Sequence, residues 1–493
     1  MWKYVVLALF FVAMIAVGIL SHRKIKTADD FVIGGRRMGP WLSAFSYVTT
    51  YFSAVIFVGY AGRFGWGFGV SATWIGIANA VIGTLLAWLL LAERTRRMTS
   101  DMGVSTLAEF FRHRYDSKTM EIAAAIVVFV FLIPYSASVY QGLGYIMQSF
   151  FEGTVLENMQ LSMLVIAVIT GIYVFFGGYI STAVNGLIQG VIMMGGIGLL
   201  IARVLKVLGG LDGGLETMAA ISDGVPAGSL ATTFGPSPFN LLVLVLMTSF
   251  GTFGLPQMIA KYSGIKSKQA GRRATIVSLV GSLIISGGAY FMGGFSRALV
   301  ESGHVPFDGT NLDRLMPAIF QVILSPELMA ILVILMLSAS MSTLASVVLV
   351  SAPTFSKTIL GLNRITPIRI LCLVFVLISY VVATTKTPIV TLMSFSWGAV
   401  SGAFIGPYIW GLYSKRITRA GAWAGMMSGL GTVVLSAVYI AFTQTMAVAT
   451  SWAPKLAVLA LCVSMVVTPV VSLLTTRISK IPEGSRYVSP AKE

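Results

Sequence analysis

Charged residues are scarce in this chain of 493 residues. Only 11% of its residues are charged and 56% are hydrophobic, whereas a soluble globular domain has about 25% charged residues. Acidic residues are also missing from the middle of every long apolar segment. A charged side chain at the centre of a membrane helix costs roughly 2.5–3.5 kcal/mol. The pattern therefore excludes a soluble protein and indicates one that crosses a membrane many times.

Cysteine and histidine are almost absent. Cys372 and Cys462 fall in apolar segments, which predicts packing roles rather than a disulfide or a metal pair. The three histidines lie in separate loops, and the chain has no nucleophile elbow, P-loop or metal-ligand spacing. The sequence therefore favours a protein that is not an enzyme.

Apolar segments of about 20 residues, the length of a membrane span, recur along the chain. We count about thirteen, at roughly 2–20, 41–62, 70–92, 120–149, 158–176, 183–206, 238–260, 274–298, 326–352, 367–385, 389–413, 420–442 and 453–475. The expected fold class is an all-α integral membrane protein, with the lipid bilayer as its main environment.

The basic residues are distributed unevenly between the two ends of the spans. If the N-terminus is placed outside, 26 of the 34 lysines and arginines fall at the cytoplasmic ends. The positive-inside rule therefore predicts a multi-pass plasma-membrane protein with its N-terminus outside and its C-terminus in the cytoplasm. This bias explains the net charge of +16 without a nucleic-acid partner, and no obligate protein partner is evident.

A late apolar segment carries a stripe of hydroxyl groups. Ser338, Ser342 and Ser346 recur every four residues, so they share one helix face. Neutral oxygens on one face suit a weakly held alkali ion better than a proton, which needs a titratable partner. The alternative is structural, because hydroxyls in membrane helices often bond only the carbonyl four residues earlier or let helices pack closely.

Two apolar segments are interrupted by residues that disfavour a straight helix. Segment 41–62 contains five Ser or Thr residues, and segment 238–260 contains Gly251, Gly254 and Pro256. The two segments occupy corresponding positions in two five-helix halves. Paired interruptions of this kind indicate an inverted-repeat transporter whose site lies between broken helices near the membrane midplane.

Four stretches carry a resemblance to a known family. They are 34–41 (GGRRMGPW), 173–181 (YVFFGGYIS), 339–343 (ASMST) and the glycine-containing stretch 411–429. With them the chain resembles the sodium:solute symporter family. Residues 49–54 (TTYFSA) and 255–257 (LPQ) look nearest to its pantothenate-carrier branch.

The resemblance implies a LeuT-type inverted-repeat (5+5) core with one extra helix before it and two after it. The corresponding divisions are 1–37 for the extra helix and cytoplasmic loop, 38–413 for the core (halves of roughly 38–206 and 238–413), 414–476 for the two extra helices and 477–493 for a cytoplasmic tail.

The resemblance also implies a sodium ion between core helices 1 and 8. Carried onto this sequence, its ligands are the carbonyls of Thr49, Phe52 and Ala339 and the hydroxyls of Ser342 and Thr343.

Three positions depart from relatives within the family. Gly186 stands where some members have an Asp that helps to bind a second sodium, and Tyr51 stands where the proline carrier has an Asp. We therefore expect one sodium as the coupling ion. Thr248 replaces a Trp of the proline carrier, which weakens a proline assignment.

Isolated polar residues in apolar helices are the candidates for substrate binding, because buried polar groups need partners. They are Ser53, Asn79, Tyr135, Gln141, Thr248 and Thr252. The alternative for each is that it ties helices together.

The predicted function is sodium-coupled symport of a small organic solute into the cell. The expected solute is a carboxylate such as pantothenate or a monocarboxylate, and a sodium/amino-acid symporter of the proline type is an alternative. A proton-coupled carrier is disfavoured by the lack of carboxylates and histidines at depth. A transport-inactive membrane solute sensor is the alternative of another class, and no appended signalling domain supports it.

Overall fold

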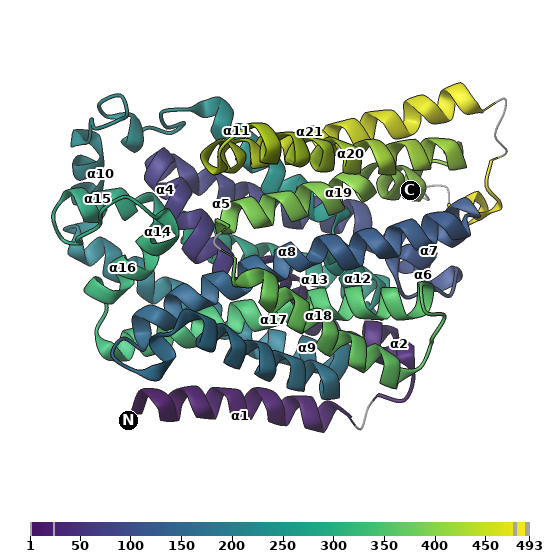
Figure 1. Cartoon of the computed structure of the whole chain (residues 1–493), viewed down its shortest axis with the longest axis horizontal. Helices are drawn as coiled ribbons and strands as arrows, with labels where there is room; N and C mark the ends of the chain where they lie inside the picture. The colour runs from purple at the N-terminus through teal and green to yellow at the C-terminus, as the bar shows by residue number, and fades with distance from the viewer. Residues whose placement is uncertain (1, 23–24, 386, 477–480, 489–493) are drawn as a thin grey trace.

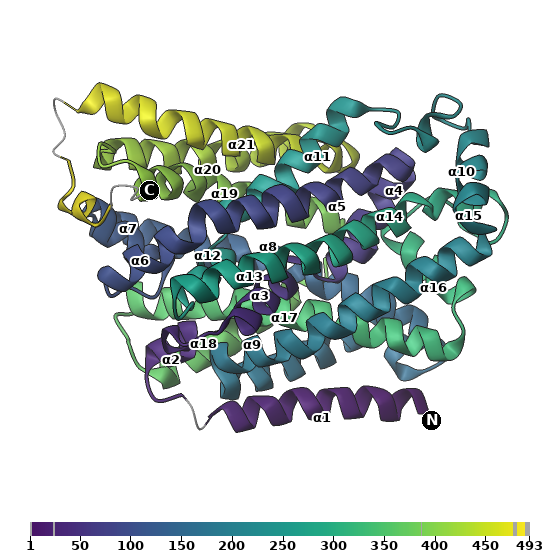
Figure 2. The same ribbon diagram turned by 180° about the vertical axis from the view of Figure 1, so that it is seen from behind.

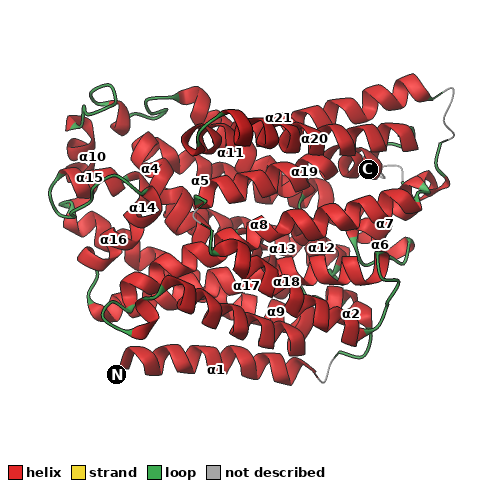
Figure 3. Ribbon diagram, in the orientation of Figure 1, coloured by secondary structure: helices red, strands yellow, loops and turns green. Residues whose placement is uncertain are grey.

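The computed structural model describes residues 2–22, 25–385, 387–476 and 481–488. Over these residues the chain consists of helices and loops (Figure 3), and its only strand-like feature is a single bridge between Met38 and Ile265. The predicted all-α class is confirmed. Part of the predicted tail 477–493 lies outside the described residues.

The helices follow one another in the order predicted from the apolar segments. The first half contains α1 (Trp2–His22), α2 (Ala28–Ile33), α3 (Pro40–Tyr51), α4 (Gly62–Phe68), α5 (Thr73–Ala80), α6 (Glu93–Asp101), α7 (Leu107–Tyr115), α8 (Lys118–Phe150), α9 (Met159–Val207) and α10 (Gly210–Ala220). The second half contains α11 (Pro238–Phe250), α12 (Pro256–Ser263), α13 (Lys268–Ser282), α14 (Gly288–Gly294), α15 (Ser296–Glu301), α16 (Leu315–Ile323), α17 (Pro326–Thr358), α18 (Ile365–Ala383) and α19 (Ile389–Tyr413). The last two are α20 (Arg419–Thr443) and α21 (Met446–Thr475).

Short 3-10 and π segments join or continue these helices. They are η1 (Gly34–Arg36), η2 (Ile56–Ala61), η3 (Gly69–Ala72), η4 (Val81–Leu86), η5 (Trp88–Ala92), η6 (Val155–Glu157), η7 (Ser229–Ala231), η8 (Gly251–Gly254), η9 (Leu283–Gly287), η10 (Leu312–Arg314) and η11 (Glu483–Tyr487).

The number of membrane spans agrees with the sequence. Ten described helices are long and apolar enough to cross a membrane, and the bent pair α11–α12 makes an eleventh. Two of these ten helices each contain two membrane spans. The 49-residue α9 changes direction at Gly178, which has φ 53°, and the run from Ile56 to Asp101 is divided at Gly69, which has φ 60°. Counted in this way, the described residues form the predicted thirteen spans.

Both predicted interruptions are breaks in the structure. Helix α3 ends at Tyr51, Phe52 is extended (φ −108°, ψ 115°), and the helical path resumes at Ala54. Helices α11 and α12 meet at an angle of 50° around η8. The second break is enforced by Pro256, which has no N–H to continue a helix, and by Gly254, where a Cβ atom would lie 2.8 Å from the backbone of Ser401.

The extra helices flank the core on opposite sides. Helix α1 packs on α9, whereas α20 and α21 pack on α19 (Figures 1 and 2). Helices α10, α15 and α16 lie at one end of the molecule, and α2, α6 and α7 lie at the other end. We call these the outer and the inner end, following the sidedness that the basic residues predict.

The local signals at the inner end were also informative. Helix α7 begins with a capping box formed by Thr106 and Glu109, a pattern that is visible in the sequence. The predicted cytoplasmic tail includes η11, which packs on α7 where it is described.

Two glutamates fall within the predicted spans, but at their ends. Glu121 and Glu327 stand in the first turns of α8 and α17. A base is also buried beside the spans. Lys261, one residue beyond the predicted span 238–260, lies in α12 and is only 1% exposed.

Candidate functional site

The middle of α17 meets the end of α3 through oxygen atoms. The hydroxyl oxygen of Thr343 lies 3.1 Å from each of the carbonyl oxygens of Thr49, Thr50 and Ala339. The hydroxyl oxygen of Ser342 lies 2.7 Å from that of Thr49. All five residues are buried. The structure thus brings together four of the five predicted sodium ligands, and it adds the carbonyl of Thr50, which the sequence reasoning missed.

Phe52, the fifth predicted ligand, lies at the break itself. Its N–H donates to the carbonyl of Val48 at 3.0 Å, and its ring stacks on Tyr51 with centroids 4.2 Å apart. A break in a helix leaves carbonyls without their usual N–H partners, and such carbonyls need another partner inside a membrane.

The oxygen cluster has more acceptors than protons to satisfy them. The carbonyl of Ala339 lies within the regular helix α17, so the carbonyls of Thr49 and Thr50 are the ones that lack a helical donor. The single proton of the Thr343 hydroxyl can serve only one of these two. Carbonyl and hydroxyl oxygens are the ligands that hard cations prefer, and unwound carbonyls coordinate sodium in broken-helix transporters. The cluster therefore has the chemistry of an alkali-ion site without a carboxylate.

The other serines of the stripe extend the contact between α17 and α3. The hydroxyl oxygens of Ser346 and Thr50 are 2.7 Å apart, so Ser342 and Ser346 share the face predicted for them. Ser338 is buried and has no hydrogen-bond partner among the described residues. Gly186 gives α9 access to the cluster, since a Cβ atom there would lie 3.0 Å from the Thr49 hydroxyl.

Several substrate candidates instead connect helices. The amide of Gln141 donates to the carbonyls of Ala383 and Thr385 at the end of α18. The amide of Asn79 donates to Ser286 and accepts from Ser249. These contacts correspond to the alternative role that the sequence left open for these two side chains.

The remaining candidates lie around the two breaks. The hydroxyl of Thr248 donates to Leu244 within its own helix, and that of Thr252 lies within reach of the carbonyls of Ser249 and Gly83. Ser53 accepts from the N–H of Val55. The hydroxyl of Tyr51 donates to the carbonyl of Thr248 at 2.6 Å and so joins one break to the other.

Trp397 of α19 lies between these elements, and the sequence reasoning missed it. Its ring centroid is 6.2 Å from those of Tyr51 and Tyr135. A Cβ atom on Gly251 of η8 would lie 2.9 Å from the same indole. The side chain of Trp397 therefore lies close to α3, to α8 and to the second break.

Unpartnered polar groups accompany this indole. The N–H of Trp397 and both amide atoms of Gln257 are buried without a hydrogen-bond partner among the described residues. The ring of Tyr135 stands edge-on to the same indole. Buried polar groups without partners are rare. Gln257, the second residue of α12, had no periodic signal that singled it out.

A cavity of about 530 Å³ opens at the outer end. It is lined by residues of α4, α11, α19 and α21, including Arg63, Leu244 and Lys455. Leu244 is one turn from Thr248, so the cavity reaches towards the second break. Arg63 pairs with Asp313 at 3.5 Å. Burial raises the pKa of Asp313, although the charge of Arg63 opposes that shift.

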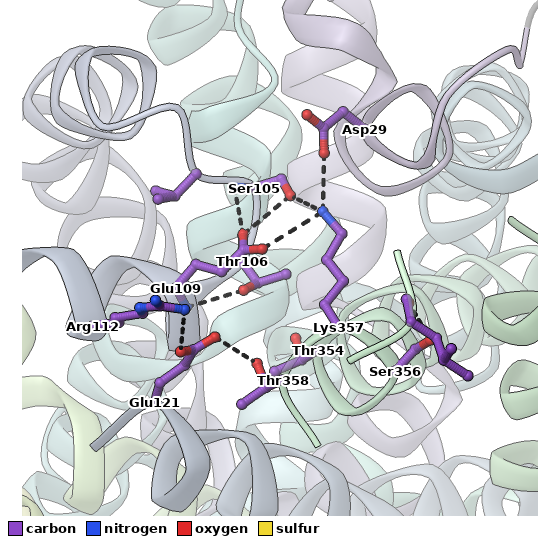
Figure 4. Close-up of polar contacts among 12 residues, drawn as sticks. Asp29, Ser105, Thr106, Glu109, Arg112, Glu121, Thr354, Ser356, Lys357 and Thr358 are labelled. Carbon is purple, nitrogen blue, oxygen red and sulfur yellow. Dashed lines mark hydrogen bonds and ion pairs between the residues drawn. The ribbon is translucent and has the colours of Figure 1, made fainter. Parts of the chain in front are cut away.

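At the inner end, polar and charged side chains join α17 to α2 and α7 (Figure 4). The ammonium of Lys357, near the end of α17, lies 3.0 Å from the carboxylate of Asp29 in α2 and 2.6 Å from the hydroxyl of Ser105. Glu109 of α7 lies 3.7 Å from the same ammonium. We call Lys357, Asp29, Ser105 and Glu109 the inner latch. Burial alone would raise the pKa of Asp29, but the neighbouring Lys357 holds it below its usual value.

Paired broken helices around a buried oxygen cluster define the class of the protein, which is a secondary transporter with a LeuT-type core. The structure is similar over 97% of this chain and 98% of the other to a sodium-coupled sialic acid symporter solved substrate-bound and outward-open, with TM-score 0.78 and 17% identity. It is also similar to Mhp1, a nucleobase-cation-symport-1 family transporter in a closed conformation (93% and 98% coverage, TM-score 0.56, 14% identity).

The chain belongs to the sodium:solute symporter family, which it matches over residues 31–429. Among curated relatives, sodium/proline symporters of Staphylococcus aureus strains bovine RF122 / ET3-1 and NCTC 8325 / PS 47 are each 26% identical over 464 residues, covering 90% of this chain and 87% of theirs. This family and fold are those of sodium-coupled transporters rather than of enzymes. The likeness to the pantothenate branch stays a prediction.

Proposed function

We propose that this protein couples the influx of one sodium ion to the uptake of a small organic carboxylate across the plasma membrane. The observation that carries the proposal is the convergence of the Thr49, Thr50 and Ala339 carbonyls on the Thr343 hydroxyl, beside Ser342. Five oxygens at one helix break provide a neutral site for a monovalent cation.

Sodium bound there would join two parts that move relative to each other. It would bridge the carbonyls of α3 and the hydroxyls of α17. A ligand shifts a conformational equilibrium only by its different affinity for the two states. Because the ligands come from both helices, sodium would stabilise the conformation in which α3 and α17 are in contact. The inner latch is formed in that same conformation. Release of sodium would therefore accompany opening of the inner end.

The substrate would lie between the two breaks, beside Trp397. The N–H of Trp397, the amide of Gln257 and the hydroxyl of Tyr135 are three donors within one buried region. The N-terminus of α12 begins at Pro256 in the same region, and a half-helix N-terminus favours a negative group. Donors of this kind fit a carboxylate, and Tyr51 and Trp397 provide apolar faces for the rest of a small molecule.

An amino acid of the proline type is the second candidate. It is supported by the sodium/proline symporters among the relatives, and it presents the same carboxylate. It also has a cationic nitrogen, for which the region around Trp397 offers aromatic faces and carbonyls. The two candidates therefore differ in whether the substrate needs an amine.

The test is uptake by the purified protein in proteoliposomes. Labelled pantothenate, lactate and proline are each offered with an inward sodium gradient, an inward proton gradient or no gradient. We expect one carboxylate to accumulate with sodium alone, and the double variant Ser342→Ala/Thr343→Ala to lose this accumulation. Uptake that follows the proton gradient and survives the double substitution would overturn the proposal.

A matched control separates the sodium site from general damage. The double variant Ser338→Ala/Ser351→Ala removes two other buried hydroxyls of α17 that have no hydrogen-bond partner among the described residues. It should retain sodium-driven uptake. Proline as the only accumulated solute would select the second candidate.

A further inference from the structure

Lys261 is a buried base beside the proposed sodium site. Its ammonium lies 2.9 Å from the hydroxyl oxygen of Ser346 and 4.8 Å from the ring centroid of Tyr179. The residue is 1% exposed and forms no ion pair with any described residue. It stands in the last turn of α12, where the carbonyl end of the helix dipole favours a positive charge.

Such a side chain is costly to keep in the core of a membrane protein. A buried charge is ordinarily paired, and an ionisable residue at membrane depth by default has a function. Packing alone does not explain it, because an apolar side chain of the same length would fill the space between Ser346 and Tyr179. The hydrogen bond and the aromatic face stabilise the ammonium without neutralising it.

The ammonium lies one helical turn from the sodium ligands. Ser346 follows Ser342 by four residues on α17, a rise of about 6 Å. Its hydroxyl also contacts that of Thr50, the neighbour of Thr49. Along α17 the order is Ser342, Ser346 and then Lys357 of the inner latch. A cation that leaves the site towards the inner end therefore meets Ser346 and Lys261 first.

We propose that Lys261, in its protonated form, acts as an internal cation that weakens sodium binding at Ser342 and Thr343 and keeps a second cation off the hydroxyls of Ser346 and Thr50. The inference rests on the proposed function. Two unit charges of the same sign about one helical turn apart repel each other appreciably even at the effective dielectric of a protein interior. The repulsion holds sodium loosely enough for release at the inner end. It also gives a physical reason for a single coupling ion.

The experiment measures sodium binding directly, by calorimetric titration of NaCl into the purified full-length protein. Lys261→Gln removes the charge, and Lys261→Arg keeps it. We expect Lys261→Gln to bind sodium roughly tenfold more tightly than the wild type and to transport more slowly. Lys261→Arg should stay within about threefold of the wild type. A merely structural role for Lys261 predicts weaker binding in Lys261→Gln, so the direction of the change distinguishes the two.

Two further variants keep the inference falsifiable. Lys261→Met replaces the ammonium with an apolar end and should tighten sodium binding as Lys261→Gln does. Ser346→Ala keeps the charge, so it should not tighten binding. If the wild type binds sodium but Lys261→Gln and Lys261→Met bind it no more tightly, this inference is wrong and the proposed function is unaffected. Wild-type protein that binds no sodium would overturn the proposed function as well.

Discussion

Helix α17 meets the N-terminal part of the chain twice, and the two contacts are made of different groups. In its middle, Ser342 and Thr343 meet the carbonyls and hydroxyls of α3, and none of these groups is charged. At its end, Lys357 meets Asp29 of α2 through an ion pair. A neutral contact that has more acceptor oxygens than protons can bind a cation. In an ion pair, the two side chains already neutralise each other. Under the proposed function, the first contact would make the conformation depend on sodium, and the second would hold the inner end without an ion.

Removing a hydroxyl from the neutral contact should have the largest effect. Thr343→Ala deletes the side chain that three carbonyl oxygens surround. A hydrogen bond or ligand to a charged group contributes about 1.5–3 kcal/mol, so the sodium concentration for half-maximal uptake should rise by roughly 10- to 100-fold. Thr343→Ser keeps the hydroxyl and should remain within a few fold of the wild type. Equal sodium dependence in Thr343→Ala and Thr343→Ser would show that the Thr343 hydroxyl does not bind sodium.

Breaking the inner latch should have a smaller effect. The carboxylate of Asp29 is 56% exposed, and such pairs contribute about 0–1 kcal/mol. Lys357→Met should therefore favour opening of the inner end by up to about fivefold, whereas Lys357→Arg should not. The readout is the rate of maleimide labelling at Thr354→Cys, a buried position one turn before Lys357. Labelling that stays as slow as in the parent protein would show that the latch does not hold the inner end.

The two ends should also respond differently to acid. The pKa of Asp29 lies below its usual value, so the latch is fully formed above the ordinary Asp range and is lost only when the pH falls through that lowered pKa. The pKa of Asp313 is raised by burial, so the outer pair with Arg63 weakens first on acidification. The thiolate is the species that reacts with maleimide, so the rate at Thr354→Cys is expressed relative to a small free thiol labelled at the same pH. This relative rate should be unchanged between pH 8 and pH 5. A higher relative rate at pH 5 would contradict the assignment of Asp29.

Replacing the native cysteines should have the smallest effect. Cys462 is exposed on α21 and Cys372 is buried in α18, and neither belongs to the oxygen cluster or the latch. Cys372→Ala/Cys462→Ser should retain uptake within about twofold of the wild type and provides the background for the labelling experiments. A large loss of uptake would show that α18 is coupled to the site more tightly than its contacts indicate.

Much of the fold could be predicted because a membrane restricts the possibilities. Every backbone polar group must be satisfied inside the bilayer, so apolar stretches of sufficient length are helices. Hydroxyl, Gly and Pro residues near Thr49 and Gly251 then mark the breaks. The signal failed for Lys261 because a single base near the end of a span looks like an ordinary cytoplasmic loop residue.

The candidate site was predicted unevenly. Ser342 and Thr343, which lie in the oxygen cluster, were selected because the serine stripe recurs every four residues and resembles a family pattern. Gln141 was selected only as a polar residue in an apolar helix, and that criterion does not distinguish a cavity from the carbonyls at the end of α18. Gln257 and Trp397 were missed because neither has a periodic neighbour.

The sequence by itself determined the class of the molecule. Its hydropathy, its excess of lysine and arginine at one set of helix ends and its paired interruptions each depend on local composition, because the bilayer acts on each segment separately. Only the tertiary structure decided which oxygen atoms meet. Thr343 lies 293 residues from Thr50, Lys357 lies 328 residues from Asp29, and Lys261 lies 85 residues from Ser346. Such contacts depend on how the helices pack and on which way each side chain points, and no single segment encodes either.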